Sequence, residues 1–177
     1  TDALCEAILD SNVKKFVFIS SIKVNGESSG INAFDESSNE NPEDNYGKTK
    51  KLAELVVRNK FERSNKDFII IRSPLIYGKK VKGNLETLLK IIKKNIPLPF
   101  KCVYNKRSIV DVTTLSKFIS LCVKENAIRS ELFLIAEEKT FTTSELIEKI
   151  ARDSNLKCLQ FCVPKFLLDI GLRLVGK

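Results

Sequence analysis

A tyrosine and a lysine, Tyr46 and Lys50, stand four residues apart in the segment YGKTK. In a helix this spacing places the phenol and the ammonium on one face, about one turn apart. A tyrosine titrates near 10, so proton transfer near neutrality requires its pKa to fall by roughly 3, which corresponds to about 4 kcal/mol. A fixed cation in a partly dry pocket supplies part of this free energy. The pair therefore indicates acid–base chemistry on an oxygen atom; the alternative is a helix-start tyrosine beside an ordinary surface lysine.

Two hydroxyl residues, Ser20 and Ser21, end the apolar run Phe16–Ile19. The run predicts a buried strand, and open α/β sheets bind their ligands at the carboxyl ends of their strands. The two hydroxyls are therefore candidates for a site at this edge. The alternative is that they satisfy the turn that follows the strand.

The chain of 177 residues contains no histidine. This excludes Ser-His-Asp and Cys-His nucleophile systems and most catalytic zinc sites. Acid–base work must fall to tyrosine, lysine, cysteine or carboxylate side chains. We expect no metal site, and the tyrosine–lysine interpretation is compatible with this constraint.

Apolar runs that predict strands alternate with amphipathic segments that predict helices, the pattern of an α/β fold. Strands are expected at 15–20, 68–72, 108–112, 132–136 and 156–163, and helices at 2–11, 46–63, 85–92, 114–124, 142–151 and from 164 onward. A polar loop spans residues 23–45. Thr113 or Thr114 is expected to cap the fourth helix, and Thr142 with Glu145 supplies capping chemistry for the fifth.

The order of a strand, a Ser-Ser pair, a long polar loop and Tyr-x-x-x-Lys at a helix start resembles the extended short-chain dehydrogenase/reductase family. Its NAD-dependent epimerase/dehydratase branch includes nucleotide-sugar epimerases, dehydratases and 4-keto reductases. The matching segments are 13–26, 46–50, 72–78 and 105–112.

The resemblance implies an α/β fold with a Rossmann-like doubly wound parallel sheet, whose amino-terminal part is missing here, and a smaller α/β substrate-binding region. Residues 1–78 would form the carboxyl-terminal part of the cofactor domain. Residues 79–177 would form mainly the substrate region, with 108–125 returning to the cofactor domain. The family's G-x-x-G-x-x-G segment is absent from this sequence. We therefore expect the carboxyl-terminal two-thirds of an enzyme, inactive as an isolated fragment because it cannot hold a dinucleotide tightly.

The resemblance also implies roles for the candidate residues. Tyr46 would be the catalytic acid/base, Lys50 would lower its pKa and bridge the nicotinamide ribose, and Ser21 would hydrogen-bond the reacting oxygen. The remaining cofactor contacts would come from Ser20, Pro74 and Ile76, beside Tyr46 and Lys50 themselves.

Substrate contacts implied by the resemblance are Asn84 and Leu85 at a helix start, Arg107 on a phosphate, and Ser21. The alternatives are a plain helix cap for Asn84 and a surface position for Arg107. Leu75 stands where many epimerases have asparagine, and a second phosphate-binding arginine is missing. Ile22-Lys23 replaces the Asp-Glu pair of the 4,6-dehydratases, which argues against dehydration.

The resemblance therefore implies an NAD- or NADP-dependent epimerase or reductase acting on a nucleotide-diphosphate sugar, similar to UDP-glucose 4-epimerase. The alternatives are a 4-keto-sugar reductase, a reductase of steroid- or flavonoid-type substrates, and a catalytically silent truncated relative. A homodimer formed through the helix at 46–63 is a further expectation from the family.

The net charge of +8 suits an anionic partner, although it also fits a solvated lysine-rich surface. We expect no nucleic-acid partner, because the basic residues are not interleaved with aromatic ones and no binding motif is present. No apolar run approaches the roughly 20 residues that span a bilayer. The five cysteines, odd in number and scattered, are expected to be reduced and mostly buried in a cytoplasmic protein.

Overall fold

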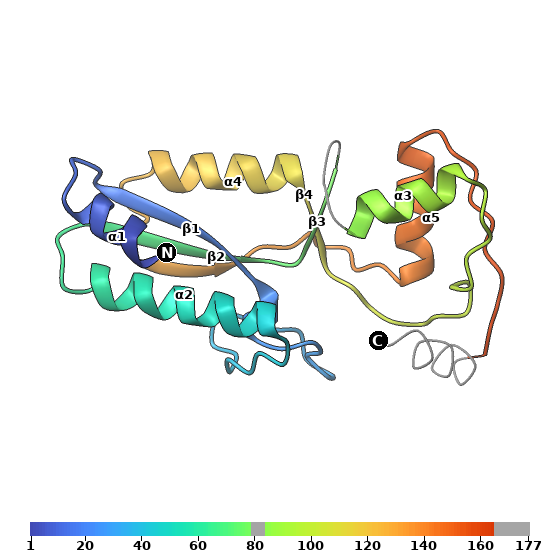
Figure 1. Ribbon diagram of the computed structural model, residues 1–177, viewed down its shortest axis with the longest axis horizontal. Coiled ribbons are helices and arrows are strands. Elements are labelled where there is room, and N and C mark those ends of the chain that lie inside the picture. Colours follow the sequence, from blue (N-terminus) through green and yellow to red (C-terminus); the bar gives the residue numbers. More distant parts are fainter. Residues whose placement is uncertain (79–83, 165–177) are drawn as a thin grey trace. The chain divides into compact units, whose positions relative to one another are not determined.

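The computed structural model describes residues 1–78 and 84–164, and its elements are labelled in Figure 1. The chain divides into two compact units. The first unit comprises Thr1–Ile76 and Val110–Ala136, and the second comprises Tyr77–Ile109 and Glu137–Lys177. Each unit is therefore built from two separate stretches of the chain.

The first unit contains a three-stranded parallel sheet. Its strands are β1 (Lys15–Ser21), β2 (Asp67–Ser73) and β5 (Glu131–Leu134), in the order β1-β2-β5. The central strand has the side chains of Ile69–Ile71 fully buried, as expected for a parallel sheet covered on both faces. Ser20 lies opposite Arg72 in the register between β1 and β2.

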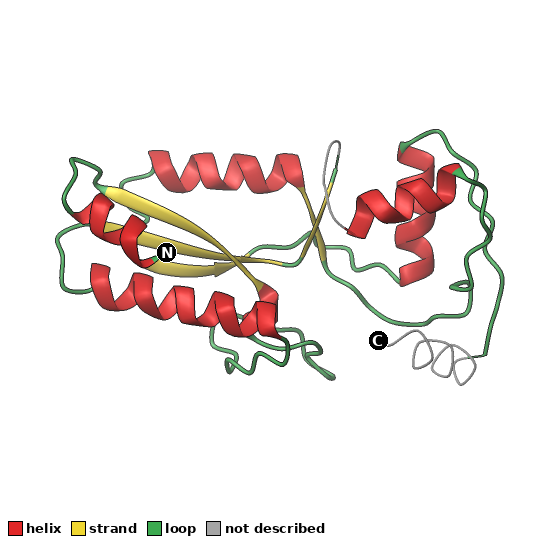
Figure 2. Ribbon diagram, viewed as in Figure 1, coloured by secondary structure: helices red, strands yellow, loops and turns green. Residues whose placement is uncertain are grey.

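Helices cover both faces of this sheet, as Figures 1 and 2 show. Alternate residues of β2 point to opposite faces. Phe68 and Ile70 pack with residues of α1 (Asp2–Leu9) and α2 (Asn45–Phe61), whereas Ile69 and Ile71 pack with residues of α4 (Val112–Lys124). This doubly covered parallel sheet confirms the predicted α/β class.

The second unit has two helices that pack together, α3 (Asn84–Lys93) and α5 (Thr143–Asp153). Their apolar faces supply the buried residues Leu85, Ile92, Leu146, Ile147 and Ile150. Thr142 and Glu145 form the predicted capping box, in which each side chain accepts a hydrogen bond from the other residue's backbone N–H.

Two short elements were not predicted from the sequence. The 3₁₀-helix η1 (Ile22–Val24) begins directly after β1. Strand β3 (Leu75–Tyr77) pairs with β4 (Ile109–Asp111) in a two-stranded sheet, at the points where the chain passes between the units. Strand β3 is short and directly follows Pro74, so the sequence contains no long alternation of apolar and polar residues that would predict it.

Three sequence-based predictions need correction. The predicted strand at 156–163 forms only an isolated bridge between Leu98 and Gln160. Helix α4 is capped by Asp111, whose carboxylate accepts from the backbone N–H of Thr113 at 2.7 Å, and Thr113 and Thr114 lie inside the helix. The carboxylate is the stronger acceptor, and Asp111 has the extended backbone that a cap requires. The helix predicted from 164 onward lies outside the described residues.

The third correction concerns the cysteines. Cys102 and Cys162 form a disulfide across 60 residues of sequence, with their Cα atoms 5.0 Å apart. Cys5 and Cys122 are buried free thiols, as expected, and Cys158 is half-buried. The expectation of five reduced thiols is therefore wrong. The cytoplasmic location stays a prediction, and this disulfide weighs against it, since disulfides are rare in the cytosol.

Among the described residues, no helix has both the length and the apolar character needed to cross a bilayer.

Candidate active site

The carboxyl end of β1 carries the two predicted serines, and their hydroxyls make different hydrogen bonds. Ser20 is 3% exposed, and its Oγ donates to Oε1 of Glu54 on α2 at 2.5 Å. Ser21 caps η1, because its Oγ accepts from the backbone N–H of Lys23 at 3.3 Å. Successive strand residues point to opposite faces, so only one of the two can face α2. The cofactor contact predicted for Ser20 stays a prediction, and the hydroxyl proton of Ser20 is already donated to Glu54.

The first turn of α2 packs closely against η1. Asp44 caps this helix by accepting from the backbone N–H of Gly47 at 2.6 Å. A Cβ atom at Gly47 would lie only 2.6 Å from the backbone oxygen of Lys23. Glycine is therefore the residue that lets the turn carrying Tyr46 approach the backbone that follows Ser21.

Lys50 holds this helix against the end of β1. Its Nζ donates to the backbone oxygen of Ile19 at 3.0 Å and lies 5.1 Å from the ring centroid of Phe18. The same Nζ lies 5.9 Å from the ring centroid of Tyr46, whose side chain is 53% exposed. The structure thus brings Tyr46 and Lys50 together, and it ties Lys50 to the residue that precedes the two serines.

An ion pair joins η1 to the start of α2. Lys23 Nζ lies 2.6 Å from Oδ2 of Asp44 and 2.7 Å from Oε1 of Glu27. The hydrogen bonds to Asp44 and Glu27 raise the pKa of Lys23. The hydrogen bond from Lys23, together with that from the Gly47 backbone, lowers the pKa of Asp44. Both groups are more than one-third exposed, so water screens the pair.

A buried network behind this corner was not predicted from the sequence. Arg72 is 1% exposed and donates from Nε and Nη2 to the two carboxylate oxygens of Glu54, at 3.0 and 2.6 Å. Its Nη1 donates to Oδ1 of Asn25 at 3.1 Å, and its Nη2 also donates to Glu40. A signal was present in the sequence, since an arginine inside an isoleucine-rich strand requires a buried partner.

The charges of this network support one another. Burial alone would lower the pKa of Arg72, but the hydrogen bonds and charges of Glu54 and Glu40 outweigh it and raise the pKa. Burial alone would raise the pKa of Glu40, but Arg72 and the neighbouring cations lower it. Arg72 and Glu40 are therefore charged near neutrality. Lys51 and Arg58 also face the two carboxylates, at 3.6 Å from Glu40 and 3.9 Å from Glu54.

The other predicted site residues are distributed over both units. Pro74 and Ile76 are half-buried beside and within β3. Leu85 is 7% exposed in the core of the second unit, and the side chain of Asn84 lies outside the described part of the chain. Arg107 is exposed, and its Nε donates to Oγ1 of Thr143 at 3.2 Å. The contacts predicted for these residues stay predictions.

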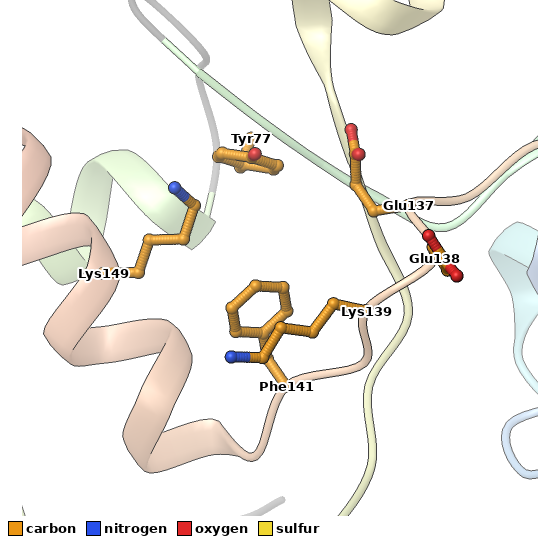
Figure 3. Close-up of a pocket in the computed structure, with 6 residues that line it drawn as sticks. All are labelled: Tyr77, Glu137, Glu138, Lys139, Phe141 and Lys149. Atoms are coloured by element: carbon orange, nitrogen blue, oxygen red, sulfur yellow. The ribbon is translucent and has the colours of Figure 1, made fainter.

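A separate cavity of about 510 Å³ lies in the second unit (Figure 3). Its lining residues are Tyr77, Glu137, Glu138, Lys139, Phe141 and Lys149. Each aromatic ring faces an ammonium group, with Lys149 Nζ 5.0 Å from the Tyr77 centroid and Lys139 Nζ 5.2 Å from the Phe141 centroid. None of the predicted site residues lines this cavity.

Comparison with known proteins shows the family of the chain and relatives that match most of its length. A family model described as the NAD dependent epimerase/dehydratase family matches residues 1–136. A UDP-glucose 4-epimerase of Vibrio cholerae is 35% identical over 176 residues, covering 98% of this chain and 54% of that protein. An N-acetyl-alpha-D-glucosaminyl-diphospho-ditrans,octacis-undecaprenol 4-epimerase of Escherichia coli O157:H7 is 26% identical, covering 96% of this chain and 50% of that protein. The chain spans about half the length of the curated relatives it matches.

Solved structures show the same fold. UDP-glucuronic acid 4-epimerase from Bacillus cereus, in complex with NAD, superposes with a TM-score of 0.75 at 22% identity. The match covers 92% of this chain and 54% of that one. The Rossmann-like architecture predicted from the sequence is therefore confirmed.

Proposed function

Because this chain belongs to the NAD dependent epimerase/dehydratase family, we propose that the full-length protein containing it is a 4-epimerase of a nucleotide-diphosphate sugar. The observation that supports the proposal is that Lys50, 5.9 Å from the ring centroid of Tyr46, is hydrogen-bonded to Ile19, the residue that precedes the two serines at the carboxyl end of β1. The identity of 35% to a UDP-glucose 4-epimerase makes UDP-glucose the first substrate to test.

In this proposal bound NAD would supply the hydride chemistry, and return of the hydride to the opposite face of the keto-sugar would invert the sugar carbon. Tyr46, acting as the phenolate, would accept the proton of the sugar hydroxyl as the carbonyl forms and, then as the phenol, would return it when the hydroxyl is restored. The exposed phenol is open to a substrate. Ser21 orients the reacting oxygen toward Tyr46.

Lys50 fits a role in binding the cofactor ribose. Its ammonium gives one hydrogen bond to the backbone oxygen of Ile19, and an ammonium has further donors for hydroxyl groups. The same ammonium lies 5.9 Å from the ring centroid of Tyr46, so one lysine lies close to both the proposed acid/base and the end of β1. Pro74 and Ile76 complete the proposed cofactor contacts, and Leu85, Asn84 and Arg107 the proposed substrate contacts.

The full-length protein with UDP-glucose and NAD tests this function by the appearance of the 4-epimer. Tyr46→Phe should reduce turnover by at least ~100-fold and leave NAD binding nearly unchanged, because it removes only the titrating hydroxyl. A loss of activity below about threefold would be incompatible with the proposed role.

A 4-keto-sugar reductase is the second candidate, because Leu75, at the position where many epimerases have asparagine, fits a reductase as well as an epimerase. The two functions differ in whether the reduced cofactor is consumed during turnover. A reductase consumes NADH or NADPH in proportion to a keto-sugar substrate, whereas an epimerase shows no net change.

We also propose that the protein forms a homodimer through α2. Two leucines on this helix, Leu52 and Leu55, are 64% and 42% exposed. Apolar side chains three residues apart lie on one face of a helix, where a second copy would bury them. Sedimentation of wild-type protein against a Leu52→Glu variant tests this, since only the variant should be monomeric.

A further inference from the structure

The buried pair of Glu54 and Arg72 takes no direct part in the proposed chemistry, although it lies directly behind the residues that do. Glu54 follows Lys50 by one helical turn on α2 and is 1% exposed. Arg72 lies near the end of the central strand β2, opposite Ser20. Neither side chain is open to a substrate.

Helix α2 is held against the end of β1 by two contacts that lie one helical turn apart, and Glu54 makes the second of them. In the first contact, Lys50 Nζ donates to the backbone oxygen of Ile19 at 3.0 Å. In the second, Ser20 Oγ donates to Oε1 of Glu54 at 2.5 Å. Two hydrogen bonds one turn apart on the helix, one donated by Lys50 to Ile19 and one accepted by Glu54 from Ser20, set both the rotation of the helix and its height along the strand.

Arg72 extends this arrangement to the polar loop between β1 and α2. Its guanidinium donates to Asn25, and the Asn25 amide in turn donates to the backbone oxygen of Ser38 at 3.1 Å. It also donates to Glu40, whose backbone oxygen accepts from Lys51 Nζ at 3.1 Å. The loop therefore enters α2, at the cap residue Asp44, from a fixed direction.

Energetics argue that this network does more than stabilise the fold. A buried ion pair often contributes no more stability than well-packed apolar residues of the same size, because both charges lose their hydration. Its geometry, however, is directional in a way that apolar packing is not, since the arginine fork makes two bonds to one carboxylate.

We propose that Glu54 and Arg72, acting through Ser20 and Asn25, are positioning residues that hold Tyr46 and Lys50 at reacting distance from the Ser21 hydroxyl. This rests on the proposed epimerase function. A displacement of about 1 Å at a reacting group costs up to ~100-fold in rate, so a small shift of α2 suffices to show the effect.

The test compares Glu54→Gln with wild type in the full-length protein. Glutamine keeps the size of the side chain but turns an amide N–H toward one of the Arg72 donors. We expect kcat to fall by at least about tenfold, while KM for UDP-glucose and Kd for NAD change by less than about threefold. Glu62→Gln changes an exposed carboxylate at the end of the same helix; it is the matched control and should leave kcat, KM and Kd unchanged.

Amide hydrogen exchange on the same proteins separates positioning from a general loss of stability. In Glu54→Gln, exchange should become about tenfold faster in residues 25–41 and 46–50 and stay unchanged at Ile69–Ile71 in the core strand. Ser20→Ala removes one hydrogen bond and no charge, so it should show the same pattern more weakly. This variant decides the matter if Glu54→Gln fails to fold.

Uniformly faster exchange, or a fall in kcat of less than about threefold, would overturn the proposal. If the wild-type protein does not interconvert UDP-sugars, the epimerase function fails independently. The exchange pattern would then still decide whether these residues fix α2 and the loop, because it requires no turnover.

Discussion

The close approach of α2 to η1 predicts an unusual result for Gly47→Ala. In an ordinary helix this substitution stabilises a protein by about 0.5–1 kcal/mol, since alanine loses less conformational freedom on folding. Here the new Cβ would lie 2.6 Å from the backbone oxygen of Lys23 and 3.1 Å from both Oδ1 of Asp44 and Cβ of Pro42. The helix start or η1 must therefore move by about 0.8 Å to reach the 3.4 Å of ordinary contact.

The magnitude follows from two opposing contributions. Overpacking of this kind costs about 1–3 kcal/mol, and the helical preference of alanine offsets part of it, so we expect a net loss of about 1–2 kcal/mol. The same displacement shifts the helical turn that carries Tyr46 relative to η1. Turnover of the full-length enzyme should therefore fall by about 10- to 100-fold.

Urea unfolding and steady-state kinetics measure the two effects on one preparation. Lys48→Ala is the matched control, because Lys48 is exposed in the same helical turn and its loss should change stability by no more than about 0.5 kcal/mol. If Gly47→Ala instead proves more stable than wild type, the close approach of α2 to η1 does not exist in solution, and the reasoning from this contact fails.

Two further predictions concern stability. The pKa of Asp44 is lowered in the folded state, so its charge stabilises the fold above its unfolded value of about 3.9, and this contribution is lost as the pH falls through the folded pKa. Asp44→Asn keeps a side chain that can cap the helix but removes the charge. The difference in urea midpoint between wild type and this variant should therefore become smaller below about pH 4. A difference in urea midpoint that does not depend on pH would contradict the ion pair with Lys23. Removal of the Cys102–Cys162 disulfide by Cys102→Ser should lower stability by about 2–4 kcal/mol, since it opens a loop of 60 residues, and Cys158→Ser is its control. Equal urea midpoints for the two variants would argue that the disulfide does not form.

Local patterns predicted much of the fold and the proximity of Tyr46 and Lys50. The run Phe16–Ile19 alone announces β1, and the spacing of Tyr46 and Lys50 within a helix brings their side chains together as expected. The capping box at Thr142 was likewise predictable, because its two partners are three residues apart in the sequence.

Contacts between distant residues could not be predicted in the same way. Glu54 lies 18 residues from Arg72, and Glu40 lies 32 residues away in a polar loop, so nothing local marks either one as its partner. Similarly, Cys102 and Cys162 are separated by 60 positions in the sequence, so no local pattern predicts that they are neighbours in the fold. At α4 the sequence analysis named two threonines as possible caps, whereas the extended backbone of Asp111 makes that residue the cap.

The division of the first unit into two chain segments has a consequence for its synthesis. The face of β2 that carries Ile69 and Ile71 is covered by α4, whose residues leave the ribosome only after the whole of 77–109 has been made. Until then the nascent chain displays a bare isoleucine surface and an unpaired strand edge where β5 will bind. Such delayed parallel pairing is slow and leaves the growing chain exposed to association with other chains during that interval.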